Sequence, residues 1–188
     1  MPLISLDKKT KERVDITEYY APKIELKGRE LECQECGGQM MIKHGLIVVP
    51  HFAHYPDPAR TCFYESESME HLMAKKALVL RLSGKGQRYQ AIYTGAKFDY
   101  EVTLKENGIV RRADILVTYP DGSREIHEIQ LSPIATQDLQ QRTADYLSMG
   151  ATVFWWLGPK AATVPNKSWC MEEHGYFAYV EPDEVQVF

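Results

Sequence analysis

The stretch "IVRRADILVTYPDGSREIHEIQLS", residues 109–132, decides the fold of this chain. It contains two runs rich in β-branched and apolar residues, 109–119 and 124–131, and the "PDG" between them is typical of a hairpin turn. Asp114 lies inside the first run and Glu128 inside the second. A carboxylate that leaves water without a partner costs several kcal/mol. The pattern therefore predicts an antiparallel hairpin in which both acids have partners or a ligand.

The segments on either side of this hairpin predict an α/β core. The predicted elements are, in order, a helix over 66–82, strands over 98–104, 109–119 and 124–131, a helix from Ser132–Pro133 to Met149, and a strand over 152–157. The strand, helix and strand at the end of this order imply a right-handed parallel crossover. The core is thus expected to be α-β-β-β-α-β, and the tail from Pro159 is expected to add a strand pair.

Composition bounds the possible partners of the chain. Its 188 residues include 44% apolar residues and a net charge of −4, so the whole protein is not a general binder of polyanions. Basic residues that gather near the start and in the middle could line a groove or merely face solvent. No apolar run is long enough to cross a membrane, and the charged start does not read as a secretory signal. A cytoplasmic location without a membrane partner is expected.

The two acids of the hairpin could form a metal site. Side chains alternate along a strand, so Glu128 and Gln130 point to the same face, and Asp114 can approach them if the hairpin pairs in register. Two carboxylates on neighbouring strands suit Mg²⁺, or Mn²⁺ in its place. Such an ion can orient an attacking water and stabilise a leaving phosphate oxygen. The alternative is an ordinary exposed pair of acids in a hairpin.

A second candidate metal site lies in the first third of the chain. Cys33 and Cys36 form a CxxC motif followed by two glycines, which is typical of a zinc knuckle. Two closed ligand sets complete a four-coordinate structural Zn²⁺ site: the CxxC pair with His54 and Cys62, or the same pair with His51 and His54. We expect residues 1–64 to form an N-terminal segment with this zinc-binding knob and one strand around 23–31. Residues 65–188 are then the α/β domain.

Several motifs in one order resemble the CoiA-like competence proteins, whose nuclease domain is of the PD-(D/E)XK type. They are "CQECGGQM", "HFAH", "ESMEHLMAKKAL", "RRADIL", "HEIQLS", "RTADY" and "VFWWL", between about Cys33 and Leu157. The resemblance implies a restriction-endonuclease-like fold in a cytoplasmic bacterial protein. It also implies metal-dependent hydrolysis of DNA phosphodiester bonds during competence and transformation, with DNA and other DNA-processing proteins as partners. The oligomeric state is not predicted.

The resemblance assigns roles to the hairpin residues. Asp114 and Glu128 would be the metal-binding acids, and Gln130 stands where the wider superfamily usually has lysine. Lysine supplies a positive charge that positions or activates the nucleophile, whereas a neutral amide only orients water by hydrogen bonds. CoiA-like proteins tolerate glutamine at this position. The alternative function is therefore a DNA-binding adaptor that keeps the nuclease fold and does not cleave, and a third is a zinc-held protein-interaction module.

The first predicted helix could supply the missing charge. Glu67, His71 and Lys75 fall on one helical face, which points toward the sheet. Lys75 could replace the lysine, and His71 could orient water or contact a phosphate. Which of Glu67 and Glu70 reaches the metal stays open. The alternative for these residues is acids that match the helix dipole, a core histidine and a surface lysine.

Two further assignments concern an arginine and the zinc ligands. Arg142 shares a helical face with apolar residues, so it needs an anionic partner. It could brace Glu128, grip a DNA phosphate or form a structural ion pair. The downstream cysteine of the family pattern favours the ligand set that contains Cys62, which leaves His51 beside the zinc or at the active site and Cys170 as a free thiol.

Overall fold

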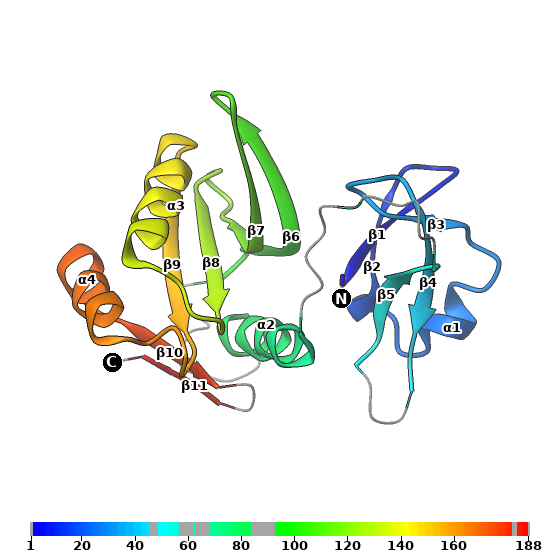
Figure 1. The fold of residues 1–188 in the computed structure, drawn as a ribbon. Helices are drawn as coiled ribbons and strands as arrows, with labels where there is room; N and C mark the ends of the chain where they lie inside the picture. Colours follow the sequence, from blue (N-terminus) through cyan, green and yellow to red (C-terminus); the bar gives the residue numbers. More distant parts are fainter. Residues whose placement is uncertain are drawn as a thin grey trace. The chain divides into compact units, whose positions relative to one another are not determined.

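A computed structural model describes residues 2–45, 49–56, 62, 68–83, 93–181 and 184–187, the last strand in its backbone only. The chain forms two compact units, Met1–Leu72 and Met73–Phe188 (Figure 1). The predicted boundary between residues 64 and 65 lies outside the described residues. No helix in the described ranges is both long and apolar enough to cross a membrane.

The first unit contains a sheet with the order β2-β1-β3-β4-β5. Its elements are β1 (Ile4–Asp7), β2 (Arg13–Asp15), η1 (Ile16–Glu18), α1 (Pro22–Glu25), β3 (Leu31–Glu32), β4 (Gln39–Lys43) and β5 (His51–His54). All neighbouring strands are antiparallel. Leu3, Ile4 and Phe52 are almost fully buried, so this unit has an apolar core of its own.

One expectation for the first unit was wrong. The strand expected around residues 23–31 is replaced by α1, where Pro22 occupies an early helical position that needs no backbone N–H donor. The segment that contains the zinc-binding knob also includes a sheet, in which β1 pairs with β2 and with β3. These strands are too short to show a clear period in the sequence.

The second unit is a six-stranded mixed sheet with the order β11-β10-β9-β8-β7-β6. Its elements are α2 (Met69–Leu82), which begins in the first unit, β6 (Lys97–Glu106), β7 (Ile109–Thr118), β8 (Arg124–Gln130), α3 (Thr136–Ser148), β9 (Ala151–Leu157), α4 (Val164–His174), β10 (Ala178–Glu181) and β11 (Glu184–Val187). Strands β6, β7 and β8 form an antiparallel meander, and β8 pairs in parallel with β9. Helix α3 packs on β9 and β7, with α4 beside it (Figure 1).

The predicted α-β-β-β-α-β order is confirmed by α2, β6, β7, β8, α3 and β9, and with it the predicted fold class. The core between α3 and the sheet includes Leu139, Ile126 and Trp155. Helix α3 begins at Thr136 rather than at Ser132–Pro133, and the Ile134 carbonyl instead accepts a hydrogen bond from Asn166 of α4. Helix α4 was not predicted, and the strand pair expected in the tail is β10 with β11.

Candidate functional site

Three acids occupy matching positions on three neighbouring strands of the second unit. The β6–β7 pairs Tyr100↔Ile115 and Val102↔Ala113 flank Glu101 and Asp114, which stand opposite each other where the ladder is interrupted. The β7–β8 ladder ends at Ile115↔His127, so the next opposed positions are Asp114 and Glu128. We call Glu101, Asp114 and Glu128 the acid row. The hairpin thus pairs in the register that brings Asp114 and Glu128 to adjacent positions.

Glu128 is 2% exposed, and its carboxylate has two partners on α3. Arg142 Nη2 lies 2.6 Å from Oε2, and the hydroxyl of Tyr146 donates to Oε1. Burial and the Glu128 charge raise the pKa of Tyr146, so its hydroxyl stays a proton donor. The Arg142 guanidinium also lies 5.2 Å from the centre of the Trp155 ring. Arg142 thus braces Glu128, one of the alternatives that the sequence left open.

The other two hairpin residues contact the backbone at the end of β8. Asp114 Oδ2 accepts a hydrogen bond of 2.8 Å from the Ile129 N–H, which fixes this carboxylate against the neighbouring strand. The side-chain amide of Gln130 donates to the Ser132 carbonyl at 2.9 Å. Gln130 is therefore held at the strand end through its amide group.

Lys75 of α2 is fully buried, and its ammonium lies 2.7 Å from Oε1 of Glu101. The other carboxylate oxygen of Glu101 lies 2.8 Å from Nη2 of Arg112. The alternative of a surface lysine was therefore wrong, because a lysine without exposed surface needs a counter-charge that Glu101 provides.

Glu101 is the site residue that the sequence did not predict. Its φ of 55° lies in the left-handed region, which costs a non-glycine residue about 1–3 kcal/mol and persists only when the surroundings impose it. The available signal was an acid between apolar residues in "FDYEVTL", the same kind of signal that singled out Asp114. Its partners could not be inferred, because Lys75 is 26 positions away on a helix.

The remaining predicted residues of the first helix lie at its start. Glu67 is outside the described residues. Glu70 is exposed in the first turn of α2, and the His71 N–H donates to Ser68 Oγ at 3.2 Å. Both belong to the first unit, and their catalytic roles stay predictions.

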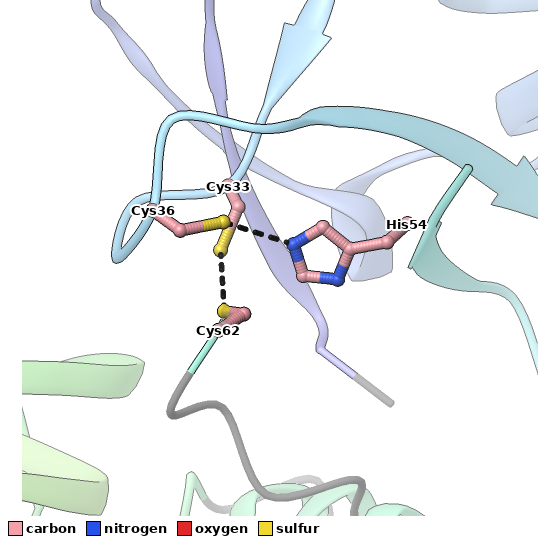
Figure 2. A group of neighbouring side chains, drawn as sticks. All are labelled: Cys33, Cys36, His54 and Cys62. Carbon is pink, nitrogen blue, oxygen red and sulfur yellow. Dashed lines mark hydrogen bonds between the residues drawn. The ribbon is translucent and has the colours of Figure 1, made fainter. Parts of the chain in front are cut away.

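Four side chains of the first unit form a compact group of metal-ligand type: Cys33, Cys36, His54 and Cys62 (Figure 2). Their ligand atoms all lie within 4.8 Å of one another. A tight turn presents the first two, since Cys33 N–H donates to Gly38 O and Gly37 N–H donates to Cys33 O, both at 2.8 Å. Gly37 has a φ of 67°, which glycine adopts without strain.

The geometry of this group fits a tetrahedral metal ion. Cys33 Sγ and Cys62 Sγ are 3.9 Å apart, close to the separation of about 3.8 Å between two thiolates that bind one zinc at 2.3 Å. Cys36 Sγ lies 3.3 Å from His54 Nε2. Burial, together with the neighbouring cysteines, raises the pKa of the Cys33 thiol to about 11, so a cation is needed to hold it as a thiolate at neutral pH. The group can hold a structural ion such as zinc.

His51 lies outside this group. Its Nδ1 lies 2.9 Å from the Val49 carbonyl oxygen, and its side chain is buried. Among the described residues, the structure therefore brings together the ligand set with Cys62 rather than the alternative set with His51.

A family with a nuclease-like domain matches the second unit of the chain. Residues 67–183 match the family described as "Competence protein CoiA, nuclease-like domain", and residues 16–65 match "Competence protein CoiA, N-terminal domain". The chain belongs to the CoiA family. Competence protein CoiA of Bacillus subtilis (strain 168) is 31% identical over 133 residues, which are 71% of this chain and 32% of that protein. This chain thus spans about a third of its relative's length.

Solved structures with partial similarity include two nucleases. A repair endonuclease from Pyrococcus abyssi matches 64% of this chain and 50% of its own, with 18% identity and a TM-score of 0.36. EndoMS in complex with double-stranded DNA matches 79% of this chain and 66% of its own, with 13% identity and a TM-score of 0.39.

Proposed function

We propose that this chain is a metal-dependent deoxyribonuclease that acts in the bacterial cytoplasm during competence. The observation that carries the proposal is the register of β7 and β8, which gives Asp114 and Glu128 adjacent positions. Membership of a family with a nuclease-like domain supports it as well. DNA and other DNA-processing proteins are the partners that this function requires.

Asp114 and Glu128 would hold Mg²⁺ or Mn²⁺, because their oxygen donors suit such an ion. When bound, the ion supplies charge stabilisation for the phosphate and an activated water. The side chains of the protein itself place further charges around these two acids. Lys75 gives the positive charge that Gln130 lacks, and the amide of Gln130 can hydrogen-bond a water at the same strand end.

The residues that the sequence assigns to the start of the first predicted helix keep their roles in this proposal. We assign His71 to orient water or to contact a phosphate, and either Glu67 or Glu70 to add an acid. Arg142 neutralises Glu128 at 2.6 Å, so the buried carboxylate is compensated before any ligand arrives. An arginine that is 28% exposed can also exchange this partner for a DNA phosphate.

A second candidate function is a DNA-binding adaptor that does not cleave. Two observations favour it. Both Glu128 oxygens already accept hydrogen bonds from α3, and the Gln130 amide is bonded to the Ser132 carbonyl. In this alternative Arg142 and Tyr146 are the permanent partners of Glu128 in place of a metal ion.

One assay separates the two functions. Single- and double-stranded DNA is incubated with the purified chain and Mg²⁺ or Mn²⁺, with Asp114→Asn and Asp114→Ala as variants and EDTA as a further control. Metal-dependent cleavage that both variants lose supports the nuclease. Binding of DNA without cleavage supports the adaptor, and a chain that neither cleaves nor binds DNA contradicts both.

The Cys33, Cys36, His54 and Cys62 group is assigned to structural Zn²⁺. A closed shell of four protein ligands leaves no position for a substrate, so such a site stabilises rather than catalyses. Zinc would join Cys62 to the three ligands presented by the sheet of the first unit and its tight turn.

A further inference from the structure

The contacts of Glu101 differ in kind from those of the other two acids in the acid row. One of its oxygens accepts from Lys75 at 2.7 Å and the other accepts from Arg112 at 2.8 Å. The acid is 1% exposed, and Lys75 has no exposed surface. A carboxylate with both oxygens committed to cations is a poor metal ligand but an effective anchor for those cations.

The charge of this group has a direct consequence for the acid row. Glu101, Lys75 and Arg112 contain two cations and one anion, so the group carries one excess positive charge. Glu101 stands opposite Asp114 at the interruption of the β6–β7 ladder, and Arg112 precedes Asp114 by two positions on β7. The excess charge is therefore delivered to the part of the sheet where Asp114 lies.

We propose that Glu101 is a positioning residue: it holds Lys75 so that a helix supplies the active-site cation that superfamily members usually carry on the β8 strand. The inference rests on the proposed nuclease function. The left-handed backbone of Glu101 fits this role. The β6–β7 ladder is interrupted at Glu101, and its carboxylate reaches both helix α2 and the neighbouring strand β7. Gln130, at the usual lysine position, then does not have to supply a positive charge.

The test uses the full chain and five variants. Glu101→Gln removes the anchor charge with little change in shape, and Lys75→Met removes the cation. Gln130→Lys is added to each of these two variants, which returns a cation to β8. Glu106→Gln is the matched control, because it removes the carboxylate charge of an ion pair on the same strand, with Arg124 at 2.6 Å, away from the acid row.

We expect Glu101→Gln and Lys75→Met each to lower kcat by about 100-fold with little change in KM, the size seen when one preorganised electrostatic group is lost. Adding Gln130→Lys should raise kcat at least tenfold in both variants. Glu106→Gln should cleave like the wild type. A purely structural defect would not be repaired by a lysine at position 130. Wild-type kcat in folded Glu101→Gln, or no rescue by Gln130→Lys, overturns the inference.

A second readout needs no metal and no activity. In ¹⁵N-lysine-labelled protein without added metal, the ammonium of Lys75 is expected to give a slowly exchanging resonance, identified by its loss in Lys75→Met. Glu101→Gln should abolish this resonance and Glu106→Gln should keep it. Its persistence in Glu101→Gln contradicts the anchoring role. If the resonance behaves as expected but the wild type does not cleave DNA, the nuclease proposal and the catalytic placement fail, and only the anchoring stands.

Discussion

Arg142 Nη2 lies 2.6 Å from Glu128 Oε2, so helix α3 supplies the counter-charge of an acid that the β8 strand buries. This contact explains how the hairpin tolerates a carboxylate in an apolar run. It also makes the stability of the second unit depend on a residue outside the sheet.

Arg142→Met should lower the free energy of unfolding by about 2–3 kcal/mol at neutral pH, because it leaves Glu128 buried without its cation. The effect is smaller than for a fully buried pair, since the Arg142 side chain is 28% exposed. Urea titration measures it. Lys97→Met, which removes an exposed pair with Asp99, should change little. The assignment fails if both variants unfold at the same urea concentration as the wild type.

The chain prepared without chelator should contain about one equivalent of zinc, as four N/S ligands bind one tetrahedral ion. Mass spectrometry of the native protein measures the metal. Cys36→Ser and His54→Ala should lose it, whereas His51→Gln and Cys170→Ala should keep it, because neither residue belongs to the group. Zinc loss in His51→Gln with retention in Cys62→Ser would instead support the alternative ligand set.

Glu125 gives the second unit a defined sensitivity to acid. Its carboxylate accepts hydrogen bonds from Tyr93 at 2.7 Å and Tyr119 at 3.0 Å, and His127 Nε2 lies 2.7 Å away. Burial alone would raise its pKa, but these three partners lower it below the ordinary value. The stabilisation is therefore complete above the unfolded pKa of about 4.3 and is lost as the pH falls through the lower folded pKa.

Glu125→Gln should accordingly weaken the decline in melting temperature between about pH 4.3 and pH 3. Thermal melts of wild type and variant across pH 3–7 measure the difference. Glu172→Gln, at an exposed position of α4, is a control for general charge removal. Parallel pH curves for wild type and Glu125→Gln would rule out the assigned role of this hydrogen-bonded group.

Thr163 caps the start of helix α4, and its side chain accepts a hydrogen bond from the Asn166 N–H at 3.4 Å. Thr163→Ala should lower the free energy of unfolding by about 1 kcal/mol, whereas Thr163→Ser should nearly preserve it, because serine is an equally good cap. Denaturant titration compares the two. Equal loss in both variants would mean that the methyl group rather than the hydroxyl matters.

The order of elements in the second unit could be predicted because its strands are long and its turns are chemically marked. The "ENG" and "PDG" turns marked the meander, and the adjacency of Asp114 and Glu128 was expected on the condition that the hairpin pairs in register, which it does. Helix α4 carries equally local signals, Thr163 before it and Gly175 after it, although it was not predicted from the sequence.

The parts that escaped prediction depend on distant pairing. The strands of the first unit are two to five residues long, too short for an alternating pattern to be recognised. Lys75 and Glu101 meet through the docking of a helix on a strand, which no local pattern records. The ligand set with Cys62 was favoured by the family pattern, since spacing alone left His51 as an equal choice.

The Lys75–Glu101 contact joins a helix to the strand at the outer end of the meander, so the charge balance of the acid row depends on a packing event. Any local opening that lifts α2 from β6 strips the ammonium from its carboxylate and removes the excess positive charge of the Glu101, Lys75 and Arg112 group. Undocking of helix α2 alone would then abolish the proposed activity while the strands stay folded. Under the proposed nuclease function, amide protection along α2 and catalytic activity would follow the same equilibrium.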